Sequence, residues 1–194
     1  MLDESKTNDN KIILHVFRQA EIGEWKNLEI DNIEKIFKIN NTKLKQALKD
    51  KKNFLAYYSE LLDSKVLLSI SKEDFKMSTK EEIIQEYFMN KLDFMNPYKF
   101  AIANIINFYN NNPKFILIML KSTKKSMSLF LSDFKTSGNK FKIKLFEKFL
   151  LILWLSVFNK WLYEDNSNSS SFATIDKGIK RIKSMTSLFD VIDK

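Results

Sequence analysis

Glycine and proline are scarce in this chain, which contains three glycines and two prolines in 194 residues. These residue types mark most tight turns, so a chain with few of them has few places where its direction reverses sharply. A fold of many short strands needs a turn roughly every 8–12 residues, whereas a fold of long helices needs far fewer connections. The sequence therefore predicts an all-α protein.

Length and composition favour a folded chain with a sizeable core. Hydrophobic residues make up 44% of the sequence, too high a share for a disordered protein. The length fits one domain, or a small head on a larger body. The chain has no cysteine, which excludes disulfides, thiolate metal sites and a cysteine nucleophile, and which is compatible with a reducing compartment.

The longest apolar run, FLLILWLSVF at 149–158, is ten residues long and has Lys148 before it and Lys160 after it. A helix that crosses a bilayer needs about 20 apolar residues, so this run predicts a buried core helix. Residues 1–10 are polar and acidic, unlike a secretory signal peptide. We therefore expect a cytoplasmic protein.

Apolar residues recur at helical spacing in the N-terminal quarter of the chain. The spacing predicts helices at 11–22, 28–38 and 42–49, followed by a longer helix that opens near Asp50. Gly23 stands where a helix C-terminal cap is expected, and Thr42 and Asp50 are the expected N-caps. Three helices with tight polar turns predict a helix-turn-helix head at 1–55 on a larger helical body at 56–194.

The body also shows recognisable helix boundaries. Thr79 and Glu82 have the spacing of a capping box, and Pro97 and Pro113 are expected as first residues of helices. A break is predicted at 132–139, which contains Gly138, before a long helix at about 140–163. The last helix is predicted to carry one apolar stripe, formed by Phe172, Ile175, Ile179, Ile182, Met185 and Phe189.

The formal net charge is +8, and it is unevenly distributed. The chain has 30 lysines and only two arginines, a pattern typical of an AT-rich genome, so part of the charge follows from codon bias. Residues 1–34 carry four cations and eight acids, whereas 35–52 carry seven lysines and a single acid. Codon bias acts on the whole chain and does not explain this contrast, so the charge at 35–52 points to a local role.

The predicted helix at 42–49 has two different faces. Thr42, Lys45, Gln46 and Lys49 share one face, and Leu44, Ala47 and Leu48 lie opposite. Cations, a hydroxyl and an amide are groups that phosphates and the base edges of the major groove accept. The predicted DNA contacts are Asn41, Thr42, Lys43, Lys45, Gln46, Lys49, Lys51 and Lys52. The alternative is a lysine face that only contacts solvent.

The run WKNLEIDNIEKIFKINNTKLKQALKDKKNFL at 25–55 resembles the N-terminal module of TetR-like transcriptional regulators. The segments LDFMNPYK at 92–99 and WLYEDNS at 161–167 are similar to an alphaproteobacterial group of that family. The sequence departs from the pattern at Lys38, where the family usually has glycine, and at Lys45 and Ala47, where an aromatic residue is usual. The resemblance implies a dimeric regulator of transcription that binds duplex DNA.

A second family with the same architecture also resembles the C-terminal part of the chain. These are the isoprenoid-lipid-binding proteins of ubiquinone biosynthesis, which do not read DNA. The similarity lies in WLYED at 161–165 with Thr174 and Asp176. The aromatic-rich segment expected before their penultimate helix is not evident. This resemblance implies the alternative function, lipid binding without DNA recognition.

The resemblance to TetR-like proteins also implies a homodimer through 140–163 and 171–189, because the last two helices build the interface in that family. The helix at 140–163 is apolar almost all round in its middle, so it needs cover on every side. The alternative is an ordinary core helix of a monomer.

Bulky residues on the body helices could line a pocket for an apolar small-molecule or lipid effector, or could simply be core. They are Phe88, Phe100, Phe108, Phe115, Met119, Trp154 and Phe158.

No pattern in the sequence predicts an enzyme. His15 is the only histidine and is expected at the inner edge of the first helix, so neither a metal cluster nor a catalytic triad is predicted. The acid pairs Glu81–Glu82 and Glu164–Asp165 fit a helix start and a polar loop. We expect no cofactor and no metal. A third possibility is a pure interaction module that dimerises without ligand or DNA.

Overall fold

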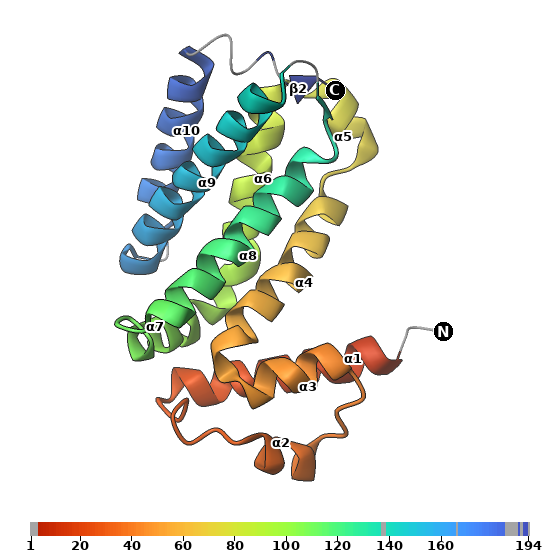
Figure 1. The fold of residues 1–194 in the computed structure, drawn as a ribbon, viewed down its shortest axis with the longest axis vertical. Helices are drawn as coiled ribbons and strands as arrows, with labels where there is room; N and C mark the ends of the chain where they lie inside the picture. Colours follow the sequence, from red (N-terminus) through yellow and green to blue (C-terminus); the bar gives the residue numbers. More distant parts are fainter. Residues whose placement is uncertain (1–3, 137–138, 166, 185–189, 191, 194) are drawn as a thin grey trace. The chain divides into compact units, whose positions relative to one another are not determined.

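The computed structural model describes residues 4–136, 139–165, 167–184, 190 and 192–193. Over these residues every regular element is a helix, apart from two antiparallel strands of two residues each (Figure 1). The prediction of an all-α protein is therefore confirmed. Gly138, Met185 and Phe189, which the sequence analysis assigned to a break and to the last helix, lie outside the described residues.

The chain divides into two compact units. Unit 1 contains Met1–Ser59 and Tyr98–Leu120, and unit 2 contains Glu60–Pro97 and Lys121–Lys194. A domain boundary near residue 55 stays a prediction, but unit 1 also takes in the segment that begins at Tyr98. The side-chain amide of Asn104 in this segment donates hydrogen bonds to the carbonyls of Ala20 and Glu21, at 3.0 and 3.1 Å.

Unit 1 combines one long helix with several short ones. Its N-terminal elements are α1 (Glu4–Glu21), α2 (Ile30–Ile36), α3 (Thr42–Lys49), the 3₁₀ turn η1 (Lys51–Asn53) and the start of α4 (Phe54–Ser69). Its later elements are the end of the 3₁₀ turn η2 (Asn96–Tyr98), α7 (Lys99–Phe108) and the start of α8 (Pro113–Leu131). Helix α3 has its predicted bounds, α1 begins earlier than predicted and α2 is shorter. Pro113 opens α8 as expected, whereas Pro97 lies within η2.

The helix ends explain where unit 1 turns. Gly23 has a φ of +86°, which favours glycine, and it ends α1 as predicted. The N-cap of α3 is Asn41 and not Thr42, because the side chain of Asn41 accepts hydrogen bonds from two backbone amides of the first turn. Asp50 makes no side-chain cap, so that prediction was also wrong. The connection from α2 to α3 starts at Phe37 in an extended conformation, and Lys38 does not have the positive φ that favours glycine.

Aromatic rings hold the core of unit 1 together. The ring of Phe17 in α1 stacks on Tyr98 with centroids 4.5 Å apart, and it contacts Phe54 and Tyr58 edge-on. Leu44 and Leu48 of α3 are buried in the same unit. Burying large side chains of this kind contributes about 1.5–3 kcal/mol each. The apolar side of α3 is therefore fixed by packing.

Unit 2 is a bundle of longer helices. In addition to the remaining parts of α4 and α8 it contains α5 (Lys72–Met77), α6 (Lys80–Met95), α9 (Lys140–Tyr163), α10 (Ser169–Ser184) and the strands β1 (Lys135–Thr136) and β2 (Ile192–Asp193). The predicted capping box between Thr79 and Glu82 opens α6, and α9 has its predicted bounds. In the described part of the chain no helix combines the length and the hydropathy needed to cross a bilayer.

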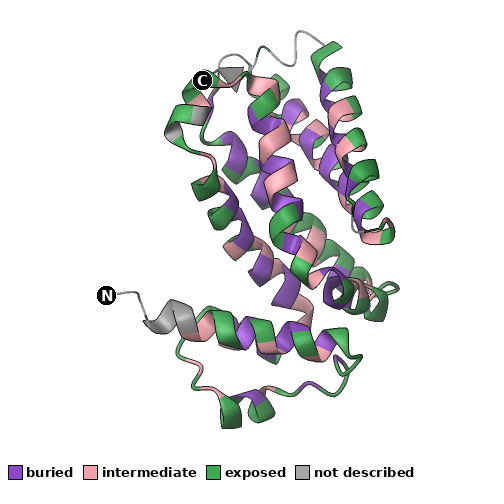
Figure 2. Cartoon of the chain, turned by 180° about the vertical axis from the view of Figure 1, so that it is seen from behind, coloured by how far each residue is buried: buried purple, intermediate pink, exposed green. Residues whose placement is uncertain are grey.

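Helix α10 packs against α9 and α6 within unit 2. Its buried residues lie along one side of the helix, as the purple stripe in Figure 2 shows, and include Ile175, Ile179 and Ile182. Gly178 allows the close approach of α10 to α9, because a Cβ at this position would lie 2.2 Å from Cδ1 of Leu153. The tight contact between these two helices therefore depends on a residue without a side chain.

Candidate nucleic-acid interface

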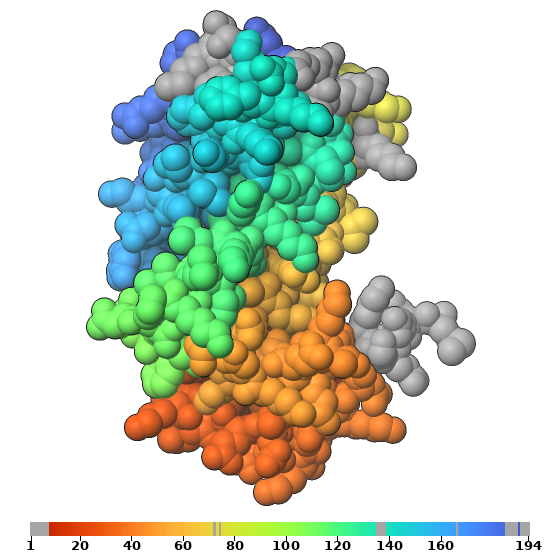
Figure 3. Space-filling view, in the orientation of Figure 1, coloured from red at the N-terminus to blue at the C-terminus, as the bar shows by residue number. Residues whose placement is uncertain are grey.

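Helix α3 presents one polar side to solvent. Leu44, Ala47 and Leu48 are at most 4% exposed, whereas the residues between them are accessible. The exposed residues of α3 are Thr42, Lys43, Gln46 and Lys49. In the space-filling view the α3 residues lie at the surface of unit 1, in orange (Figure 3). The two-faced helix that the sequence predicts is therefore present.

Asn41 was predicted to contact DNA, but its side chain is used within the fold. Its Oδ1 accepts hydrogen bonds from the backbone amides of Lys43 and Leu44, at 3.0 and 3.2 Å. Its Nδ2 donates to the Asp9 carboxylate at 2.7 Å and to the Tyr57 hydroxyl at 3.2 Å. Asn41 therefore positions the start of α3, and its role as a base or phosphate contact is not supported.

Lys51 was also predicted to contact phosphate, and the structure assigns it another role. Its ammonium donates to the carbonyls of Trp25, Lys26 and Leu28 at 2.8, 3.1 and 2.8 Å. It also lies 5.5 Å from the centroid of the Trp25 ring, a cation–π distance. Desolvation lowers the pKa of Lys51, and the charge of Glu29 partly opposes this shift. Lys51 therefore fixes the segment that connects α1 to α2.

Two further predicted lysines take part in ion pairs at the surface. The Lys45 ammonium contacts the Glu34 carboxylate, and the Lys52 ammonium lies 3.1 Å from Asp50. Burial alone would raise the pKa of Asp50, but the hydrogen bond and charge of Lys52, with the charge of Lys114, lower it below its ordinary value. Exposed pairs contribute about 0–1 kcal/mol, so a phosphate can replace either carboxylate at low cost.

Four of the eight predicted contacts remain available without breaking an interaction. In the part of the chain that the structure describes, the side chains of Thr42, Lys43, Gln46 and Lys49 make no hydrogen bond or ion pair. Thr42, Gln46 and Lys49 share one face of α3, and Lys43 lies at its edge. Together they offer two ammonium groups, an amide and a hydroxyl. These four residues are the candidate interface.

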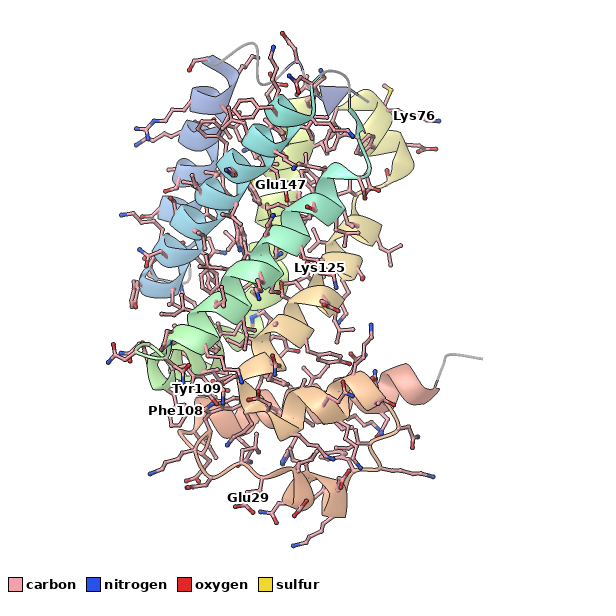
Figure 4. The ribbon with its side chains drawn as sticks, viewed as in Figure 1. Glu29, Lys76, Phe108, Tyr109, Lys125 and Glu147 are labelled. Carbon is pink, nitrogen blue, oxygen red and sulfur yellow. The ribbon has the colours of Figure 1, made fainter. Side chains whose placement is uncertain are left out.

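The seven residues proposed to line an effector pocket are divided between the two units. In unit 2, Phe88 stacks on Trp154 with centroids 5.6 Å apart, and Phe158 contacts the same tryptophan. The other four belong to unit 1, where Phe115 is buried, Met119 is half-buried, and Phe100 and Phe108 are 64% and 49% exposed. Phe108 packs on its neighbour Tyr109 at the end of α7 (Figure 4). The pocket stays a prediction.

Unit 2 contains a buried polar cluster that the sequence analysis did not identify. The Lys91 ammonium of α6 contacts the Asp63 carboxylate of α4 and lies 2.5 Å from the Ser126 hydroxyl of α8. Ser126 donates to Asp63 at 2.7 Å, and the Tyr87 hydroxyl donates to the same carboxylate at 3.3 Å. All four side chains are less than 5% exposed.

Aromatic rings enclose the ammonium of this cluster. It lies 5.0 Å from the Trp154 ring centroid and 5.7 Å from that of Tyr87. Desolvation lowers the pKa of Lys91, and the charge of Asp63 opposes that shift. A buried charge needs such partners because an isolated one is strongly unfavourable. The cluster therefore ties α4, α6 and α8 together, and we assign it to stability.

Comparison of the chain with family models, with curated proteins and with solved structures finds no match. We therefore describe the class of protein from its fold and from the exposed side of α3. It is an all-helical protein in which a capped eight-residue helix exposes a cationic face.

Proposed function

We propose that this protein binds duplex DNA through α3 and acts as a transcriptional regulator of the TetR-like type. One observation carries the proposal. The apolar side of α3 is buried, while Thr42, Gln46 and Lys49 on the other side are exposed and make no bond in the described structure. A helix held in this way can enter a major groove, which is wide enough to admit an α-helix.

The chemistry of the exposed side suits a nucleic acid. Lysine ammonium groups neutralise phosphates, and an amide such as that of Gln46 can pair with the N6 and N7 edge of adenine. Asn41 fixes the start of α3, and Lys51 fixes the segment between α1 and α2 in the same unit. We therefore propose that Lys43 and Lys49 contact phosphate and that Thr42 and Gln46 face the bases.

The charge distribution also supports α3 as the side of unit 1 that faces DNA. Residues 35–52 are cationic, whereas 1–34 are acidic overall. A polyanion is attracted to the first segment and repelled by the second. This contrast favours an approach of DNA through α3.

Removing two of the proposed phosphate contacts should weaken DNA binding. In the Lys43→Gln/Lys49→Gln variant we expect the affinity for duplex DNA from the region upstream of its own gene to fall about tenfold or more at low salt. The log–log salt slope should flatten by about 1.8, because each phosphate contact contributes about 0.9. Fluorescence anisotropy at several salt concentrations measures both quantities.

A matched control removes the same charge elsewhere. Lys121 and Lys124 are exposed on α8, outside the proposed interface. Their replacement by glutamine should leave the salt slope within about 0.3 of the wild-type value, because no phosphate contact is lost. Equal losses in both double variants would show that only net charge matters, and would contradict the proposed interface.

A TetR-like function also requires a homodimer, which we propose to form through α9 and α10. The exposed apolar residues of α9 include Phe141, Leu155 and Tyr163, which share one side of the helix. A two-fold dimer would present two α3 helices to successive turns of the major groove, roughly 34 Å apart. Of the predicted surface at 171–189, residues 171–184 belong to α10, and residues 185–189 lie outside the described part of the chain.

A charge within that apolar stripe should dissociate the dimer. We expect Leu155→Glu to shift the mass measured by sedimentation from dimer to monomer, because a carboxylate in an apolar interface is left unpaired. Lys160→Gln makes the same change in net charge on another side of α9 and should leave the mass unchanged. A wild-type protein that sediments as a monomer would refute the dimer.

A further inference from the structure

A groove runs between α9 and α10 in unit 2, with a volume of about 400 Å³. Leu153 and Ile182 form its floor, and Phe149 and Ile152 line its α9 side. Lys177 and Arg181 lie on its α10 side. Its volume falls within the range of roughly 300–1,000 Å³ that small-molecule sites occupy.

The groove owes its shape to Gly178. This residue is in contact distance of Leu153, and any Cβ would overlap that side chain. Because α10 presents no side chain at this turn, nothing from position 178 covers the apolar floor. The groove therefore lies directly over buried aliphatic side chains instead of ending on a polar surface.

Two of the four cations of α10 have acidic partners in the described structure, and the other two do not. Lys180 lies 2.8 Å from the Asp176 carboxylate, and Lys183 lies 2.6 Å from that of Glu81. Lys177 and Arg181, one helical turn apart, have no ion pair within the described structure, and they are the two that line the groove. Arg181 is one of only two arginines against 30 lysines. A guanidinium can hold a carboxylate through two parallel hydrogen bonds, which an ammonium cannot do.

We infer that this groove binds a single-chain anionic amphiphile of the fatty-acid type. The carboxylate lies between Arg181 and Lys177, and the hydrocarbon chain lies over Ile152 and Leu153. An apolar trough with two unpaired cations at one side complements such a molecule in both shape and charge. The inference does not depend on DNA binding. Ile152 shares the side of α9 that carries Phe141, Leu155 and Tyr163, so the groove adjoins and partly overlaps the surface that we propose for dimerisation.

Isothermal titration calorimetry with laurate, below its critical micelle concentration, tests the inference. We expect laurate to bind the full-length protein, and 1-dodecanol, which has the same chain without the charge, to bind at least about tenfold more weakly. The Lys177→Gln/Arg181→Gln variant should lose about tenfold or more in laurate affinity. The Lys180→Gln/Lys183→Gln variant removes the same charge from the same helix and should stay within about twofold.

A substitution at the apolar side completes the test. Ile152 is 58% exposed, so Ile152→Asn should leave the melting temperature nearly unchanged while it weakens laurate binding. Absence of laurate binding, equal affinity for dodecanol, or equal losses in the two glutamine double variants would overturn the proposal. If a second copy of the chain fills the groove instead, the wild-type protein will sediment as a dimer that binds no laurate, and this result would also overturn the proposal.

Discussion

Replacing Lys91 by methionine is expected to lower the free energy of unfolding by about 3–5 kcal/mol, because the change leaves a buried carboxylate without its charge partner. Asp63 is 4% exposed and, among the described residues, would keep the hydroxyls of Ser126 and Tyr87 as its hydrogen-bond donors. Urea unfolding followed by tryptophan fluorescence is a suitable measurement, because Trp154 and Trp161 both lie in unit 2.

Lys125 provides a matched control on the same unit. Lys125 lies on α8 (Figure 4). Its ammonium is 2.7 Å from the Glu60 carboxylate, and the two side chains are 68% and 43% exposed. Lys125→Met should therefore cost less than about 1 kcal/mol. Combining Lys91→Met with Asp63→Leu should recover much of the lost stability, because neither charge is then left unpaired. Equal effects of Lys91→Met and Lys125→Met would contradict the structural role of the cluster.

The second large effect is expected at Lys51. In Lys51→Met the carbonyls of Trp25, Lys26 and Leu28 lose a shared charged donor. Hydrogen bonds to charged groups contribute about 1.5–3 kcal/mol, and these carbonyls can partly recover bonds to water, so we expect a loss of about 2 kcal/mol. Limited proteolysis should also cut the segment between α1 and α2 faster.

Lys52 is the neighbouring control for this prediction. Its ammonium pairs only with Asp50 at the surface among the interactions described. We expect Lys52→Met to change the unfolding free energy by less than about 1 kcal/mol and to leave the rate of proteolysis unchanged. If Lys51→Met changes the unfolding free energy and the rate of proteolysis as little as Lys52→Met does, Lys51 does not hold the segment between α1 and α2. Lys51 would then again be a candidate phosphate contact.

The sequence predicts those parts of the fold that depend on local interactions. The bounds of α3 and α9 and the capping box at Thr79 agree with the structure because spacing and capping chemistry act within a few residues. The buried side of α3 was also predicted correctly, since period and polarity determine which side packs.

Tertiary contacts decide the remainder. Asn41 and Thr42 can both cap a helix, and the fold selects Asn41 because Asp9 and Tyr57 satisfy its amide. Lys43 and Lys51 are the same residue type, yet one is exposed and the other bonds three carbonyls from a loop more than twenty residues earlier in the chain. No local pattern separates them.

The lysine-rich composition hides two further features. Lys91 lies on the apolar stripe of α6, but in a chain with 30 lysines one more lysine gives no signal of burial. The groove beside Gly178 depends on the residues of α9 that face it, and their identity follows only from the packing of the two helices. The aromatic pocket stays a prediction for a related reason, since side-chain type alone does not indicate which residues meet.

Lysine acetylation footprinting, with and without duplex DNA, tests most directly whether the exposed side of α3 is the DNA-binding surface. The proposal predicts that DNA protects Lys43 and Lys49, that Lys51 reacts slowly in both states, and that Lys121 and Lys124 react equally in both. Unchanged modification of Lys43 and Lys49 at a DNA concentration that saturates binding would contradict it.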